Sequence, residues 1–157
     1  MALDRLRQYL DDHDTEYVVV SRSKAYTAQK IAASAHISGK QVAKSVILNA
    51  DEKMVMVVVP APHRVDLNRM KNILKAEVVS LAKEVEFQRQ FPDCETGAMP
   101  PFGNLYEMDV FVDKSLTEDE VIAFNACSHR ELVRMAFKDF EKLVKPVVID
   151  CTLHYSG

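Results

Sequence analysis

The segment GAMPPFG, residues 97–103, contains residue types that could present the backbone to a ligand. It holds two of the four glycines and two of the six prolines in the chain. Glycine can adopt a positive φ and leaves its backbone unscreened, whereas proline has no N–H and a fixed φ. The N–H groups before the prolines could therefore converge on an anion or on a carbonyl oxygen that develops negative charge. The residues concerned are Gly97, Ala98 and Met99, followed by Pro100 and Pro101. A rigid connection without a ligand would use the same residues.

Two side chains elsewhere are candidates for polar roles. Lys44 opens an apolar run in QVAKSVIL, where a partly dehydrated ammonium could hold a carboxyl or phosphate oxygen or orient a substrate. The alternative is a lysine that snorkels at a strand end. His129, in NACSHRE, could position a hydroxyl or a water, or simply occupy a surface turn. Cys127 lies two residues away, but residues this close usually point apart, which disfavours a Cys–His nucleophile.

Composition restricts the class of protein. The 157 residues are 48% hydrophobic and 27% charged, which predicts one soluble globular domain over residues 1–157. No apolar run approaches a membrane span, and the N-terminus lacks a signal pattern, so we expect no membrane partner and a cytoplasmic location. Three cysteines without a CxxC favour reduced thiols. No metal-ligand spacing or Gly-rich nucleotide motif occurs, so we expect neither a metal nor a cofactor.

Charge is distributed unevenly along the chain. The formal net charge is −3, which argues against a protein coated with nucleic-acid-binding charge. Residues 17–50 nevertheless contain five basic residues and no Asp or Glu. Such a segment can contact a phosphate-rich partner over a small area, although a solvated surface is the simpler interpretation.

Hydrophobic periodicity and turn residues predict the secondary structure. The helices are expected at residues 2–12, 27–35, 65–74, 82–90 and 137–144. The strands are expected at residues 17–21, 44–49, 53–60, 77–80, 108–113, 121–126 and 131–137. NADE between the second and third strands indicates a hairpin, and both of its strands are apolar enough to be covered on two faces. The order predicts an α+β fold with a mixed sheet wrapped by helices.

Four segments together resemble the YbaK/ProX family of aminoacyl-tRNA deacylases, the editing domains associated with prolyl-tRNA synthetase. They are AYTAQKIAASAHISGKQVAKSVIL (residues 25–48), VPAPHRVDLNRM (59–70), FPDCETGAMPPFGNLYEMDVFVD (91–113) and FNACSHRELVRMAF (124–137). Two marks are fairly specific in this order, a lysine that opens the strand after an Ala-rich helix and a GxxxP loop. The resemblance extends from about residue 3 to residue 146.

The resemblance implies a mainly antiparallel, partly barrel-like sheet and a metal-independent hydrolase acting on the ester of mischarged tRNA. The family lysine corresponds to Lys44, and the GxxxP loop to Gly97, Ala98, Met99, Pro100 and Pro101, which would line the aminoacyl pocket. Tyr26, Ser45 and His129 map near that pocket. The implied partners are the acceptor end of a mischarged tRNA and, in some settings, an aminoacyl-tRNA synthetase.

The implied chemistry needs little machinery, because an aminoacyl ester is already activated. A positioned water, a polarised carbonyl and an oriented substrate suffice, and a hydroxyl of the terminal ribose could assist the water. One departure stands out: many relatives have glycine where this chain has Cys127. Two alternatives therefore stay open, a non-catalytic module that binds tRNA or a synthetase, and a small-molecule binder or hydrolase that uses the same cavity.

Overall fold

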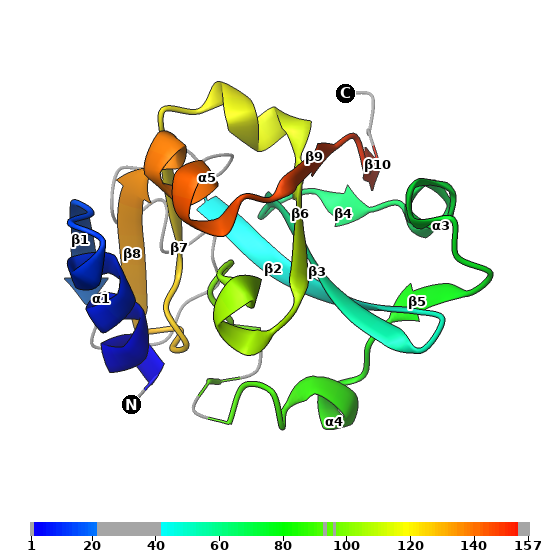
Figure 1. Cartoon of the computed structure of the whole chain (residues 1–157), viewed down its shortest axis with the longest axis horizontal. Coiled ribbons are helices and arrows are strands. Elements are labelled where there is room, and N and C mark those ends of the chain that lie inside the picture. The colour runs from blue at the N-terminus through cyan, green and yellow to red at the C-terminus, as the bar shows by residue number, and fades with distance from the viewer. Residues whose placement is uncertain (1, 22–41, 93, 96, 154–157) are drawn as a thin grey trace.

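The computed structural model describes residues 2–21, 42–92, 94–95 and 97–153. Its main sheet has the strand order β1-β8-β7-β2-β3-β6-β9, with β5 added to β2 (Figure 1). The strands are β1 (Tyr17–Ser21), β2 (Val42–Ala50), β3 (Lys53–Pro60), β5 (Val79–Leu81), β6 (Asp109–Asp113), β7 (Val121–Asn125), β8 (Glu131–Ala136) and β9 (Val147–Ile149). The helices are α1 (Ala2–Asp12), α3 (Leu67–Leu74), α4 (Glu84–Phe87) and α5 (Phe137–Val144), with 3-10 turns η2 (Gly103–Tyr106) and η3 (Lys114–Glu118). A small sheet pairs β4 (Arg64–Val65) with β10 (Thr152–Leu153).

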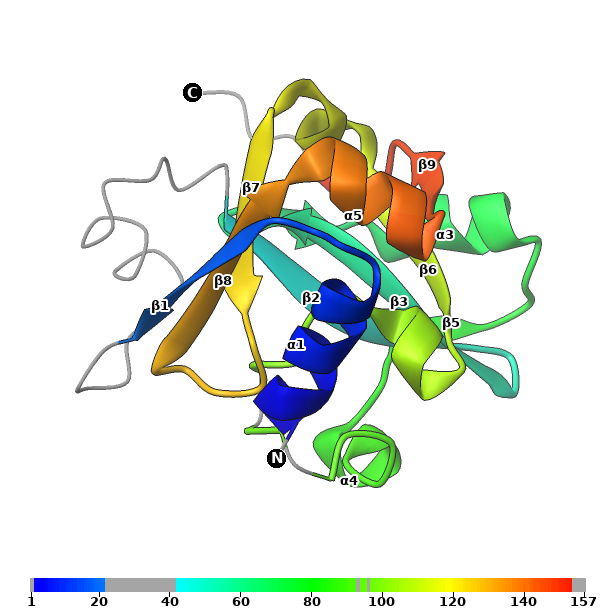
Figure 2. The ribbon, with the colours of Figure 1, turned by 60° about the vertical axis from the view of Figure 1, so that its left-hand side comes forward.

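Helices α1 and α5 cover one face of the main sheet, where the larger core lies (Figure 2). The apolar stripe of α1 buries Leu6 and Leu10, and α5 buries Phe140 completely. A hydrogen bond of 3.3 Å from the Tyr9 hydroxyl to the Leu143 carbonyl joins the two helices. The helical period read from the sequence is thus explained by burial against the sheet.

The β2–β3 hairpin separates the two cores. The turn places Asp51 at a φ of 55°, and its carboxylate accepts hydrogen bonds from the N–H groups of Glu77 and Val78. Residues 55–60 of β3 are all buried, as the continuous apolar run predicted. On the second face, α3 packs Met70 against the sheet, and Asp66 caps this helix by accepting from two backbone N–H groups.

One edge of β2 is left partly open. The other edge pairs with β3 along almost its full length, so β7 and β5 must share this one. The parallel pairing with β7 covers only Val42 and Ala43, and the pairing with β5 starts at Leu48. In the described part of the chain, no strand pairs with this edge over residues 44–46, which we call the sheet opening. Lys44 is the first residue of the sheet opening.

The predicted α+β class with a mixed sheet is confirmed. Four strand pairs in the main sheet are antiparallel and three are parallel. The expected helix at 82–90 is shorter, at Glu84–Phe87, and the predicted helix at 27–35 lies outside the described residues. Strands β4, β9 and β10, of two or three residues each, were not predicted, whereas β5, also of three residues, overlaps the strand expected at residues 77–80.

A buried acid anchors the segment between β9 and β10. Asp113 is 1% exposed, and its carboxylate accepts hydrogen bonds from the N–H and hydroxyl of Ser115 and from the N–H of Cys151. These donors compensate for burial of the charge. Within the described residues, no helix is both long and apolar enough to cross a bilayer.

Candidate functional site

The GAMPP loop (residues 97–101) follows an irregular path, as its composition predicted. Gly97 is exposed and has a φ of 79°, a conformation that glycine adopts without a Cβ penalty. The other four residues of the loop are buried, and Met99 belongs to the larger core. The loop is therefore anchored on its apolar side and presents its backbone at Gly97.

The expectation that three adjacent N–H groups converge is wrong for Ala98. The Ala98 N–H donates to the Glu95 carbonyl at 3.0 Å, because the chain forms a tight turn from residue 95 to residue 98. The N–H groups of Gly97 and Met99 have no hydrogen-bond partner among the described residues. Any oxygen bound by this loop would thus find two free donors rather than three.

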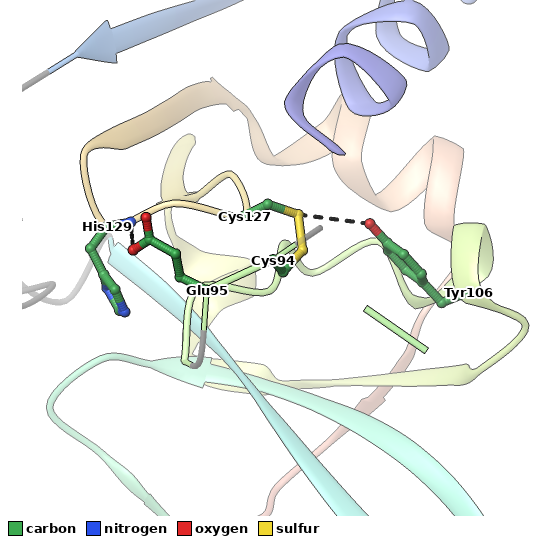
Figure 3. Close-up of a disulfide and its surroundings, with 5 residues drawn as sticks. All are labelled: Cys94, Glu95, Tyr106, Cys127 and His129. Carbon is green, nitrogen blue, oxygen red and sulfur yellow. Dashed lines mark hydrogen bonds between the residues drawn. A yellow bond between two sulfur atoms is a disulfide. The ribbon is translucent and has the colours of Figure 1, made fainter. Parts of the chain in front are cut away.

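Several bonds tie the GAMPP loop to the turn between β7 and β8 (residues 126–130). The Cys127 N–H donates to the Ala98 carbonyl at 2.7 Å, and the Glu95 N–H donates to the Cys127 carbonyl at 2.9 Å. A disulfide joins Cys94 to Cys127 across a sequence separation of 33 residues (Figure 3). The expectation of reduced thiols is therefore wrong for these two cysteines, which folding brings together from distant parts of the sequence. Cys151 is free and buried.

Cys127 adopts a backbone conformation that is typical of glycine. Its φ is 68°, in the left-handed region that a residue with a Cβ rarely occupies. The backbone path expected for a glycine is thus kept, and the side chain is used for the disulfide. The Cys127 sulfur also lies 3.8 Å from the Tyr106 hydroxyl oxygen.

His129 lies directly against the GAMPP loop. A Cβ built on Gly97 would be 3.7 Å from Cε1 and 3.9 Å from Nε2 of His129, so the ring packs beside the glycine backbone. The His129 N–H donates to Oε2 of Glu95 at 3.2 Å, which holds the turn in place (Figure 3). The structure therefore brings together two of the predicted residues, Gly97 and His129. It adds Glu95, which sequence reasoning did not identify.

Lys44 occupies β2 opposite Val59 and is half-buried. Burial, and secondarily the Arg64 guanidinium, lower the pKa of the Lys44 ammonium below its ordinary value. Within the described part of the chain, the ammonium has no hydrogen-bond or ion-pair partner. A half-buried cation without an internal acid is available to an external anion or carbonyl oxygen.

Lys44 and Ser45 belong to opposite faces of β2. Ala43 and Ile47, on the Ser45 side, pack in the larger core with Met99, whereas Leu48, on the Lys44 side, packs in the smaller core. The Ser45 hydroxyl is buried without a partner in the described residues. In the described part of the chain, no strand closes the edge of β2 at the sheet opening, so both faces of β2 border this edge. Tyr26 lies outside the described residues, as do residues 22–41 of the acid-free segment.

Lys44 is connected to the GAMPP loop through β7. Ala43, next to Lys44, pairs with Phe124 in β7, and three residues later Cys127 donates to Ala98. The lysine and the loop therefore flank the same corner of the sheet. In the described part of the chain, no three His, Cys, Asp or Glu side chains are grouped to hold a metal ion.

A cavity of about 430 Å³ is bordered by Met99 of the GAMPP loop and by residues that precede the loop. Its apolar lining includes Phe87, Phe91 and Met99, and its mouth carries the charged residues Glu84, Arg89 and Glu95. Cys94 is half-buried and also lines it. This volume is in the range of small-molecule sites.

Comparison with known proteins relates the chain to aminoacyl-tRNA editing domains. A sequence profile of the aminoacyl-tRNA editing domain matches residues 22–143. The proline–tRNA ligase 1 of Bacillus thuringiensis subsp. konkukian (strain 97-27) is 27% identical over 118 residues, which cover 75% of this chain and 20% of the ligase. The chain thus spans about a fifth of the length of the curated relatives it matches.

Two crystal structures share the fold. A hypothetical protein superposes with a TM-score of 0.86 at 18% identity, over 95% of this chain and 99% of its own. A protein described as a candidate trans-editing enzyme for prolyl tRNA synthetase gives a TM-score of 0.85 at 18% identity, over 98% of each chain.

Proposed function

The chain belongs to the aminoacyl-tRNA editing domain family, and from this premise we propose that it is a deacylase acting in trans on mischarged tRNA. The resemblance noted from the sequence is confirmed by this family match. Action in trans is supported by the neighbour described as a candidate trans-editing enzyme, 98% of which this chain covers. The reaction proposed is hydrolysis, without a metal ion, of the ester between an amino acid and the 3′ end of tRNA, in the cytoplasm where tRNA is charged.

Lys44 is the residue on which the proposal depends. Its half-buried ammonium, with a lowered pKa and no partner in the described residues, is the single observation that carries the assignment. A substrate oxygen near the scissile ester would supply the missing partner, and desolvation strengthens that interaction. Arg64 adds a second positive charge nearby, which favours the phosphates of the acceptor end.

The GAMPP loop and His129 form the second wall of the proposed site. The free N–H groups of Gly97 and Met99 are donors for the carbonyl oxygen as the tetrahedral intermediate forms. His129, which packs against Gly97, would confine the attacking water or a ribose hydroxyl. Ala98, Pro100 and Pro101 would shape the aminoacyl pocket through their buried positions, and Ser45 and Tyr26 remain proposed contacts.

The test is a panel of mischarged tRNAs incubated with the parent protein and with Lys44→Ala. We expect the substitution to lower the rate of amino-acid release roughly 100-fold, the effect of removing one oxyanion-stabilising group. Lys53→Ala is the matched control, since Lys53 is an exposed lysine on the adjacent strand that pairs with Asp109 at 2.6 Å. That variant should retain activity within about twofold, because exposed ion pairs contribute little.

Two outcomes would contradict the proposal. Equal rates for the parent and Lys44→Ala would remove the role of the lysine. Binding of tRNA without release of any amino acid across the panel would instead favour a non-catalytic module.

A further inference from the structure

The Cys94–Cys127 disulfide joins a residue that lines the cavity to the turn that carries His129 (Figure 3). Its two sulfurs have different environments. Cys94 is half-buried and lines the cavity of about 430 Å³, so a small thiol can reach it from solvent. Cys127 is 4% exposed and belongs to the same turn as His129. This asymmetry decides which sulfur an external thiolate can attack, because access governs thiol–disulfide exchange.

The structure also places a hydrogen-bond donor beside the sulfur that would leave in such an exchange. A disulfide sulfur carries no hydrogen, so in the 3.8 Å contact between Tyr106 and Cys127 the hydroxyl must be the donor. If the Cys94–Cys127 bond breaks, this hydroxyl already points at the sulfur that becomes a thiolate. A hydrogen bond to the thiolate lowers its basicity, and less basic thiols leave faster.

We infer that this pair is a thiol–disulfide exchange site for a low-molecular-weight thiol, entered at Cys94 and linked to the GAMPP loop. The thiolate attacks Sγ of Cys94 to form a mixed disulfide, and the electron pair of the broken bond passes to Sγ of Cys127. A second thiolate then attacks the sulfur of the bound thiol. This step releases the Cys94 thiolate and the oxidised dimer of the small thiol, so two external thiols supply the two electrons. The oxidised dimer reverses both steps.

The mixed disulfide on Cys94 would change the proposed deacylase site. The attached group would occupy the cavity, one wall of which is Met99 of the GAMPP loop. Breaking the bond also removes the covalent link between Cys94, three residues before the GAMPP loop, and the turn that carries His129. Regulation of hydrolysis rests on the function proposed above, whereas the exchange reaction does not.

The exchange is tested by mass spectrometry, without tRNA. Cys127→Ser and Cys94→Ser are each incubated with oxidised glutathione, and the adduct is located by peptide mapping. We expect Cys94, in the first variant, to be modified at least tenfold faster than Cys127 in the second. Equal rates, or faster modification of Cys127, would overturn the proposed entry at Cys94.

Cys151 is the internal control in every sample. Burial, with the neighbouring Asp113 carboxylate, raises the pKa of its thiol, so it should remain unmodified in a folded protein. The parent protein, treated with reduced glutathione and then alkylated, covers the case in which a serine variant fails to fold. It should show glutathione on Cys94 and the alkyl group on Cys127, and the reverse pattern would contradict the inference.

Tyr106→Phe tests the leaving side. We expect the reduction of the disulfide to be about threefold slower than in the parent, the effect of about one unit in the pKa of the leaving thiol. An unchanged rate would show that the hydroxyl takes no part.

The regulatory link is tested separately, by measuring deacylation with oxidised, reduced and glutathionylated parent protein. Unequal rates support the regulatory link, and equal rates leave an exchange site without control of hydrolysis and refute that link.

Discussion

The two walls of the proposed site are held in place in different ways. Lys44 is positioned by β2 alone, through a hairpin with β3 and a two-residue pairing with β7. The opposite wall has no regular secondary structure, and its position depends on cross-links: the Cys94–Cys127 disulfide, two backbone bonds involving Cys127, and the bond from His129 to Glu95. A strand can therefore carry an isolated reactive group, whereas a loop needs local bonds to hold its donors in place.

The difference between the two walls predicts that the Lys44 side chain lowers the stability of the folded protein. Lys44→Met should reduce hydrolysis roughly 100-fold and at the same time raise the free energy of unfolding at neutral pH, because it replaces a half-buried charge without a partner in the described residues by an apolar chain. Activity assays and urea denaturation measure the two effects. A loss of stability would mean that the ammonium is a structural group, and the contrast between the walls would fail.

The second wall should depend on its covalent link. Cys94→Ser should lower the free energy of unfolding by about 3 to 4 kcal/mol, since the disulfide restricts a long segment of the unfolded chain. The double variant with Cys127→Ser should lose no more than the single variant, because both remove the same bond. Denaturation without a reducing agent is the measurement, and the parent with a reducing agent should match the variants.

The lowered pKa of Lys44 predicts that stability and hydrolysis depend on pH through this one residue of the first wall. Because the folded-state pKa is lowered, the unfolded chain binds more protons between the two pKa values, and stability should rise with pH in that window. Hydrolysis should fall over the same window as the ammonium deprotonates, at a lower pH than for an ordinary lysine. Lys44→Met should abolish the slope in stability, and a slope that persists would assign it to another group.

Gly97→Ala probes the loop wall at its exposed point. Among the described residues, the new methyl group would meet just the His129 ring, at an ordinary contact distance of 3.7 Å, so its effect should come from the positive φ. We expect a loss of about 1 kcal/mol in stability. We also expect a reduction of about tenfold in hydrolysis, as the adjacent N–H donors shift. Thermal denaturation and the same tRNA assay check this, and an unchanged rate would mean that the loop does not contact the ester.

The smallest effect concerns the backbone of Cys127. In a Cys94→Ser background, which removes the disulfide from every protein compared, Cys127→Gly should be more stable than Cys127→Ala by about 1 kcal/mol, because its φ is 68°. Equal stabilities would indicate that the turn relaxes when the disulfide is absent.

Much of the fold was predictable because burial imposes a period on each element. The N-terminal helix at Ala2–Asp12, the strand at Tyr17–Ser21 and the last helix at Phe137–Val144 match the predicted bounds. Strands β4, β9 and β10 were missed, since two or three residues are too few to show a period, although the equally short β5 overlaps a strand that was expected.

The site was less predictable because its geometry arises between distant segments. Composition identified the loop, and Gly97 has the positive φ expected of it. No spacing rule could show that Cys94 meets Cys127 or that Glu95 accepts from His129, because only the folded topology places residues 94–101 beside the β7–β8 turn. Composition also could not show that the Ala98 N–H already donates a hydrogen bond within its own turn.

The anchoring of the C-terminal segment by Asp113 has a consequence for local opening. Residues near a chain end usually fray and exchange their amide hydrogens quickly with solvent deuterium. The Cys151 N–H instead donates to a carboxylate that is itself 1% exposed. Its exchange should therefore be as slow as that of the central strands, so that the backbone at Cys151 opens only when the end of β6 opens with it.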